Sequence, residues 1–564
     1  MRTKRYSILL LAATFVFAAF SAAAQGTGRP DFNRARTYDV QHYLIRVSFD
    51  RAKKKVFGDT TVSLKPLAGE FRSVDLDAVG MTFDSVTLEP TGTKLDYKVT
   101  PGKVIVSLDK TYGPDDLISV RLKYSTVPTK GVYFVAAEAG HSAQIWSQGE
   151  ADENRHWFPS FDFPSDKATS EEYITAQAGE TVVGNGEFLG KDNNADGTVT
   201  WHYKMPVPHS SYLVSFAIGD YVRVDDKYGD IPLGYYIYPG REQTARNAYG
   251  KTPDMIKTYE ELTGVKFPYN KYDQTVVAHF QFGGMENITA TTMADIEIFF
   301  ADTDFGKDTT IDLVSHELAH SWFGDMLTCK NWAELWLNEG FATYMEAAYR
   351  EKAFGRDAYI RKVKSDADQF MIGDVLTRNK IGLFNRHAGS VDSLFDSTTA
   401  PVIYNKGGVV LHMLREQVGT ENFWKALNTY LNRFRFQNVE SSDLQKVMEE
   451  TSGQDLKWFF DQWIYGTSFP HITATETYSA KSKTLKVTLS QTQAAGALVP
   501  GAFRLPLDVK LTSGQGTVSE KIEMTKRVQI FTFKTDAKPT AITFDPGSKI
   551  PLKTIKQGPI LGIR

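Results

Sequence analysis

Apolar residues recur at every second position through the first part of the chain. In the stretch HYLIRVSFD, Tyr43, Ile45, Val47 and Phe49 alternate with polar or smaller residues. Similar runs, namely KVIVSL, ISVRLKY, TVTWHYKM and LVSFAIG, are separated by turns rich in glycine, proline and aspartate. A period of two predicts strands that bury one face. We therefore expect a large, mostly antiparallel β domain over residues 25–238.

Beyond Pro239 the apolar residues take the three- and four-residue steps of helices, as in NAYGKTPDMIKTYEELTG. Ser442 and Gln445 have the spacing of a capping box, which marks the start of a helix. This pattern predicts a mainly helical domain over residues 239–469, with a short strand element around HFQFGGMEN.

The period of two returns in the last part of the chain. Leu485, Val487 and Leu489 alternate with polar residues, and so do the apolar residues between Phe503 and Leu511. Such strands predict a small β-sandwich over residues 470–564. Together the three patterns predict a multidomain α+β protein.

The chain begins with MRTKRYSILLLAATFVFAAFSAAAQ. A basic start, an apolar run from Ile8 to Phe20, and small residues at Ala22 and Ala24 predict a secretory signal peptide over residues 1–24. The run is shorter than the roughly 20 residues that a membrane span needs, and no later segment is long and apolar enough. We therefore expect a secreted protein whose mature chain has no membrane span.

The cysteine content bears on the cellular compartment of the protein, and its net charge bears on the class of partner that it binds. Cys329 is the single cysteine, so no intramolecular disulfide can form, and a secreted chain of this kind favours a bacterial periplasm. The formal net charge of -3 is mildly acidic, which argues against nucleic acid as a partner.

The stretch VSHELAHSWFGDMLTCKNWAELWLNEGFATYME contains the candidate catalytic residues. His316 and His320 are four residues apart on a predicted helix, so both imidazoles can bind one metal ion. Glu317 lies about 100° further round the helix, where it can act as a general base without being a ligand. Glu339, on the next predicted helix, completes a set of two histidines and one carboxylate that favours zinc. Glu346, two turns further along, can orient a ligand histidine.

Other residues of the helical region have structural interpretations. Trp322, Trp332 and Trp336 are expected in the core, where large aromatic side chains bury most area. His412 is expected to lie on a helix with hydrogen-bond partners for its ring.

HELAHSWFGDMLT followed by WLNEGFATYME, with GGMEN upstream and VIYNKGG downstream, resembles the aminopeptidase N and leukotriene A-four hydrolase family of gluzincins. The resemblance covers roughly residues 38–470. It implies a saddle-like N-terminal β domain, a thermolysin-like catalytic domain that is mainly helical, and C-terminal additions. It also implies a zinc metalloaminopeptidase, which hydrolyses the N-terminal peptide bond of its substrates.

The resemblance implies one zinc ion per chain and a role for each residue around it. His316, His320 and Glu339 would bind the zinc. Glu317 would activate the attacking water. Tyr404 of VIYNKGG would take the position of the family tyrosine that donates to the developing oxyanion.

The resemblance also implies peptide substrates with a free N-terminus. Glu286 of GGMEN would bind the α-ammonium group, and Glu150 matches a position where the family has Glu or Gln as a second contact to the amine. The backbone at Gly283 and Gly284 would run beside the peptide, and Met285 would help to shape the pocket for the first side chain. Carboxylates placed there bind the amine and fix which bond is cut.

Several alternatives stay open. The same zinc site could serve an epoxide hydrolase with a lipid-shaped tunnel, or an endopeptidase that accepts N-blocked substrates. The chain could also be a non-catalytic periplasmic peptide-binding protein, although Glu317 and Tyr404 are intact and binding alone requires neither. The oligomeric state stays open as well.

Overall fold

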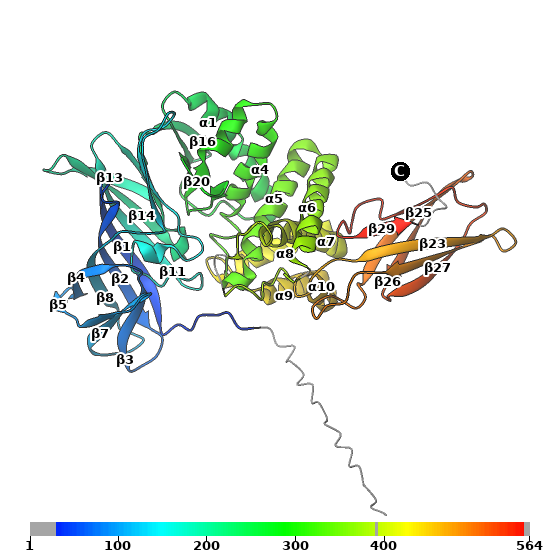
Figure 1. Cartoon of the computed structure of the whole chain (residues 1–564), viewed down its shortest axis with the longest axis horizontal. Coiled ribbons are helices and arrows are strands. Elements are labelled where there is room, and N and C mark those ends of the chain that lie inside the picture. Colours follow the sequence, from blue (N-terminus) through cyan, green and yellow to red (C-terminus); the bar gives the residue numbers. More distant parts are fainter. Residues whose placement is uncertain (1–29, 379, 390–392, 558–564) are drawn as a thin grey trace, which may run out of the picture. The chain divides into compact units, whose positions relative to one another are not determined.

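The structure is a computed structural model that describes residues 30–378, 380–389 and 393–557 (Figure 1). The predicted signal peptide, residues 1–24, lies outside the described residues. All elements below belong to one compact unit that begins at Phe32.

The alternating pattern of the first part folds into an eight-stranded sheet, drawn in blue and cyan in Figure 1. Its order is β13 (Glu187–Asn193), β14 (Thr198–Ser210), β11 (Lys167–Gln177), β1 (Tyr38–Asp50), β2 (Lys55–Pro66), β8 (Ile118–Thr126), β4 (Thr82–Glu89) and β5 (Thr93–Lys94). β1 and β11 are parallel, and the other neighbouring strands are antiparallel.

Two smaller sheets complete the N-terminal β region. One joins β3 (Phe71–Asp77), β7 (Lys103–Tyr112) and β6 (Tyr97–Val99), and the other joins β12 (Thr181–Gly184), β15 (Phe216–Gly219), β10 (Gln144–Ser147) and β9 (Val132–Val135). Tyr43, Ile45 and Val47 of β1 are buried in the hydrophobic core of this region. The period of two therefore identified the buried face correctly.

A five-stranded sheet spans the predicted limit between residues 238 and 239. Its order is β16 (Val222–Tyr228), β17 (Ile231–Ile237), β18 (Tyr272–Val277), β20 (Ala290–Ala294) and β19 (Gly284–Met285). β17 pairs in parallel with β18, so two strands from before the limit share a sheet with three strands from after it. The domain limits themselves stay predictions.

The middle of the chain is mainly helical, as its apolar spacing predicts. The helices are α1 (Glu242–Tyr249), α2 (Thr252–Thr263), α3 (Asp295–Phe299), α4 (Gly306–Ala319), α5 (Trp336–Phe354), α6 (Arg356–Thr377), α7 (Gly407–Val418), α8 (Thr420–Arg433), α9 (Ser441–Ser452) and α10 (Lys457–Trp463). A short parallel pair, β21 (Thr328–Cys329) and β22 (Asn438–Val439), lies among them. Trp322, Trp332 and Trp336 are buried in the core, as predicted.

The start of α9 differs from the prediction. The residue that precedes the helix is Glu440, whose backbone N–H donates to Asp443 Oδ2 at 2.9 Å. The predicted box at Ser442 and Gln445 is wrong because the helix begins at Ser441. The buried Ser441 hydroxyl accepts a hydrogen bond from the Trp336 indole N–H at 2.9 Å, which fixes this end of the helix in the core.

The last part of the chain forms two sheets. One has the order β27 (Val528–Lys534), β24 (Thr484–Gln491), β23 (His471–Ser479) and β29 (Thr554–Gln557), and the other β26 (Gly516–Met524), β25 (Leu505–Ser513) and β28 (Ala541–Phe544). Their buried residues continue the core of the helical region, where the ring of Trp463 lies 5.3 Å from that of Phe503. The predicted α+β order of β region, helical region and C-terminal strands is confirmed.

Candidate active site

Two neighbouring helices bring the three predicted metal ligands together. His316 lies in the last turn of α4, His320 follows that helix directly, and Glu339 lies in the first turn of α5. Glu339 Oε2 is 3.1 Å from His316 Nε2 and 3.4 Å from His320 Nε2. Both imidazoles therefore face the same carboxylate oxygen.

The hydrogen bonds of the two imidazoles fit a metal site. His316 Nδ1 lies 2.7 Å from Glu346 Oε1, and His320 Nδ1 lies 2.9 Å from the carbonyl oxygen of Phe323. Because a carbonyl or carboxylate oxygen can only accept, each Nδ1 carries the hydrogen. Nε2 is then the nitrogen of each ring that faces Glu339 and that would give up its hydrogen to bind a metal ion, which is the arrangement that outer hydrogen bonds give to ligand histidines.

The site lies in a cavity of about 540 Å³ with a large surplus of acidic groups. The acidic residues that line it are Glu150, Glu286, Glu317, Glu339, Glu346 and Asp366. Lys362 also lines the cavity, and its ammonium group bonds to Glu346 and Asp366 at 2.9 and 2.8 Å. Burial opposes the charged form of His320, but Glu286 and Glu339 raise its pKa to about 10. Such a negative cavity favours a divalent cation and a cationic ligand.

Glu317 lines this cavity together with the predicted ligands. Burial raises the pKa of Glu317 to about 8, and its Oε2 atom has no hydrogen-bond partner among the described residues. Gly284 lies so close that a Cβ atom there would be 2.3 Å from Glu317 Oε1. The glycine thus makes room for a carboxyl group whose Oε2 atom is not held by a hydrogen bond among the described residues.

Glu150 and Glu286 form an acidic pair beside Glu339. Single oxygen atoms of these three carboxylates lie within 4.8 Å of one another. The Tyr212 hydroxyl donates to Glu286 Oε1 at 3.2 Å, whereas Glu150 Oε1 is buried without a hydrogen-bond partner among the described residues. Burial and then the charge of Glu286 raise the pKa of Glu150 well above its usual range. A cation is the group that would satisfy both acids.

The glycines of GGMEN lie on a sheet edge next to the acidic pair. Gly284 and Met285 form β19, the last strand of the five-stranded sheet, and pair with Met293 and Thr292 of β20. The carbonyl oxygen of Gly283 accepts from Ala294 N–H at 2.9 Å. An edge strand can pair with an extended peptide, so its position suits a peptide backbone.

Tyr404 lines the same cavity as the GGMEN segment. It is part of a π-helical turn, η6 (Val402–Lys406), that leads into α7, and such turns are frequent at functional sites. Its ring stacks on that of His316, with centroids 5.8 Å apart and planes 15° apart. Burial and then Glu339 raise the pKa of the Tyr404 hydroxyl well above its usual range, so it is a proton donor at neutral pH.

Some residues that complete the site were missed by sequence reasoning. Tyr212 holds Glu286 and accepts from Asn338 Nδ2 at 3.2 Å, and Gln148 Nε2 donates to Met285 Sδ at 3.1 Å. These contacts join distant parts of the chain, so no local pattern indicates them. Lys362 and Asp366 stand four residues apart on α6, and that spacing was a usable signal for a buried ion pair.

The chain matches two domain families. Residues 39–213 match the Peptidase M1 N-terminal domain, and residues 247–463 match the Peptidase family M1 domain. The second match contains the metal ligands, Glu317, Tyr404 and the GGMEN segment.

Curated relatives are longer than this chain. Probable aminopeptidase 2 of Sulfurisphaera tokodaii is 27% identical over 401 residues, which are 70% of this chain and 50% of that protein. Tricorn protease-interacting factor F2 of Thermoplasma acidophilum is 26% identical, over 84% of this chain and 59% of that protein. Aminopeptidase N of Streptomyces lividans is 32% identical, over 59% of this chain and 39% of that protein.

A solved structure shares the fold. The crystal structure of Legionella pneumophila aminopeptidase A in complex with aspartic acid has a TM-score of 0.77 at 18% sequence identity. The match covers 93% of this chain and 60% of that chain. Because the match to the Peptidase M1 N-terminal domain is followed along the chain by the match to the Peptidase family M1 domain, the chain belongs to the peptidase M1 family.

Proposed function

We propose that this protein is a zinc-dependent aminopeptidase that hydrolyses the N-terminal peptide bond of peptides. One observation carries the proposal: Glu150 and Glu286 are buried beside the predicted metal ligands, and among the described residues neither forms an ion pair with a lysine or arginine. Glu286 instead pairs with the predicted ligand His320, whose Nδ1 lies 4.0 Å from Glu286 Oε1. A substrate's α-ammonium group would supply the missing positive charge. An enzyme that cuts within a chain has no need of this pair.

The residues present fit zinc. His316, His320 and Glu339 would hold it, because two imidazoles and one carboxylate with an open fourth position are typical of catalytic zinc sites. Zinc, when bound, supplies a Lewis acid that acidifies water and polarises the substrate carbonyl. Glu346 fixes the ring of His316 through Nδ1, and Lys362 in turn holds Glu346.

The surrounding side chains carry out proton transfer, stabilisation of the oxyanion and binding of the substrate amine. Glu317 accepts a proton from the attacking water and passes it to the leaving amine, a role for which its Oε2 atom, without a hydrogen-bond partner among the described residues, is placed beside the predicted ligands. Tyr404 donates a hydrogen bond to the carbonyl oxygen as negative charge develops, an effect worth a few kcal/mol for one donor. Glu150 and Glu286 bind the ammonium group, which places the first peptide bond at the metal.

The cellular setting is a separate part of the proposal. The basic start, apolar run and small residues of the first 24 positions support export by a signal peptide, and the lack of any possible disulfide supports a bacterial periplasm. Among the described residues, no helix is both long and apolar enough to cross a membrane. Peptides with free N-termini are the proposed partners.

Substitution Glu317→Gln tests catalysis against simple peptide binding. The amide keeps the shape of the side chain but cannot take a proton, so we expect turnover to fall about 10²- to 10⁴-fold. Zinc bound at His316, His320 and Glu339 should be retained as in the wild type, and affinity for a peptide should be retained. Turnover at the wild-type rate in a clean preparation would overturn the assignment of the base. Retained affinity in a wild-type protein that shows no turnover would favour a binding protein instead.

A further inference from the structure

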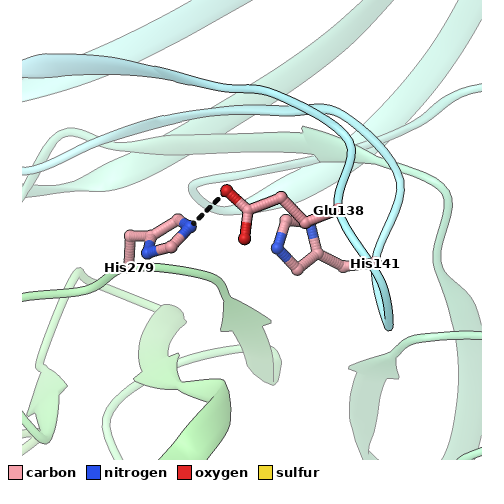
Figure 2. A group of neighbouring side chains, drawn as sticks. All are labelled: Glu138, His141 and His279. Atoms are coloured by element: carbon pink, nitrogen blue, oxygen red, sulfur yellow. Dashed lines mark hydrogen bonds and ion pairs between the residues drawn. The ribbon is translucent and has the colours of Figure 1, made fainter.

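A second group of metal-binding side chains lies outside the cavity just described. Glu138 and His141 belong to the loop between β9 and β10, where they face each other across an isolated antiparallel bridge. His279 lies in the loop that follows β18. Figure 2 shows the three side chains pointing toward one another from these two loops.

The distances within this group suit a small cation. One ligand atom from each residue lies within 4.8 Å of the others. His279 Nε2 is 3.2 Å from Glu138 Oε1, close to the separation of about 3.3 Å between two ligands of a tetrahedral zinc ion. With side chains 58% and 56% exposed, His279 and Glu138 are open to an ion from solution and can close the remaining gap by small rotations.

The hydrogen bond of His141 leaves one of its ring nitrogens for a metal ion, and His279 has an uncommon backbone conformation. His141 Nδ1 lies 2.9 Å from the carbonyl oxygen of Ser142, so Nδ1 carries the hydrogen and the Nε2 lone pair is left for a metal. The backbone of His279 has a φ of 59°, in the left-handed region that residues other than glycine seldom adopt.

The two loops lead directly to the acidic pair of the active site. The 136–143 loop continues through β10 to Glu150, and the loop with His279 continues to Glu286. Next to the group, the Ala278 N–H donates to Gln144 Oε1 at 2.9 Å, and the Trp146 indole N–H donates to the Ala278 carbonyl at 3.2 Å. A cross-link here would therefore join the segments that carry both carboxylates.

We propose that Glu138, His141 and His279 form a second metal site, for a borderline divalent ion such as zinc, that fastens the 136–143 loop to the segment leading into GGMEN. Two imidazoles and one carboxylate are donors that zinc, nickel or copper accept, and the exposed position leaves room for water as a further ligand. The site is separate from His316, His320 and Glu339. Its occupancy does not depend on the proposed catalytic activity.

The number of zinc ions bound tests the proposal. We expect titration calorimetry of the full mature chain to show two zinc ions per chain, the second one binding more weakly. His279→Ala should weaken the second ion at least about tenfold and leave the first unchanged. His320→Ala should leave the second ion in place. His202→Ala is the matched control, because His202 pairs with Glu171 at 2.7 Å in a partly buried position but belongs to no three-residue metal-binding group among the described residues.

Hydrogen exchange gives a second readout that does not involve turnover. In the wild type, the second equivalent of zinc should slow amide exchange in residues 136–143 and 278–286, and in His279→Ala it should not. One zinc ion per chain across the whole titration would overturn the proposal. So would a second ion that binds His279→Ala as tightly as wild type, or a second ion that leaves exchange in both loops unchanged.

Discussion

The carboxylate of Glu317 is placed by a neighbour that has no side chain. Gly284 on β19 lies against it, and any Cβ at that position would overlap the carboxylate. The spacing of His316, Glu317 and His320 was predictable because residues on one helix have fixed relative directions. The contact between Glu317 and Gly284 was not predictable from the sequence, because it joins the edge of a sheet to a helix that comes later in the chain.

Substitution Gly284→Ala tests this contact. The new methyl group would lie 2.3 Å from Glu317 Oε1 and must displace it, so we expect kcat to fall about a hundredfold while the protein stays folded. Gly283→Ala is the matched comparison, because its Cβ meets the flexible end of Leu313 at 3.1 Å. Steady-state kinetics and circular dichroism measure both variants. Equal losses of kcat in the two variants would contradict the role of Gly284 in making room for Glu317.

At the scale of elements, α5 and α7 approach each other through two glycines. A Cβ on Gly407 would lie 2.6 Å from Gly340 Cα, and one on Gly340 would lie 2.8 Å from Gly407 Cα. Gly340 follows the predicted ligand Glu339, and Gly407 follows the turn that holds Tyr404. The close helix contact therefore sets the separation of these two side chains.

Substitution Gly407→Ala should push the two helices apart. Because the clash is with backbone atoms, we expect the free energy of unfolding to fall by about 1–3 kcal/mol, and kcat to fall as Tyr404 moves. Gly102→Ala, where the added Cβ meets nothing within 4 Å, is the control and should change little. Denaturant titration of zinc-loaded protein measures the difference. Stability equal to wild type in Gly407→Ala would contradict the tight packing.

Element types were more predictable than element limits. Long runs in which apolar residues repeat with a clear period correctly predicted the strands around Tyr43 and the helices around His316. Burial of one face of a strand or helix imposes this period. The start of α9 was misplaced, since the buried bonds of Ser441 come from tertiary packing that local spacing does not contain. Tyr212 was missed for the same reason: its bond to Glu286 spans 74 residues.

At the scale of the whole molecule, one buried histidine links the helical region to the C-terminal strands. The Tyr359 hydroxyl and His412 Nδ1 are 2.7 Å apart, and His412 Nε2 lies 2.8 Å from the carbonyl oxygen of Ser548. The carbonyl can only accept, so Nε2 donates and Nδ1 accepts from Tyr359. The expectation of a helix histidine with satisfied ring nitrogens is confirmed.

Acid should weaken the folded state through His412. Burial lowers its pKa to about 4, whereas the unfolded chain binds the proton near pH 6.5. The contribution of His412 to the free energy of unfolding is therefore fully present above pH 6.5. It declines as the pH falls toward 4, and the loss is about 2 kcal/mol at pH 5. His412→Gln, which can keep both hydrogen bonds, should lose less stability than wild type between pH 7.5 and 5. Equal losses in denaturant titrations at the two pH values would contradict this role.

The proposed site for the substrate's α-ammonium group could be predicted only in part from the sequence, because the β region and the helical region both contribute residues to it. Glu286 lies on the sheet edge beside the metal ligands, but Glu150 reaches it from the N-terminal β region, which local patterns do not relate to the cavity. The family resemblance identified both acids. The structure adds their separation, their burial and their support from Tyr212.

The most direct test of the proposed function compares kcat/KM for an aminoacyl chromogenic substrate with kcat/KM for its N-acetylated counterpart, in zinc-loaded wild type and Glu286→Gln. Loss of a buried partner for the ammonium group costs about 2–5 kcal/mol. We therefore predict strong preference for the free amine in wild type, and a fall of about a hundredfold in that preference in Glu286→Gln. Equal kcat/KM for free and acetylated substrates in wild type, or an unchanged preference in Glu286→Gln, would contradict the account.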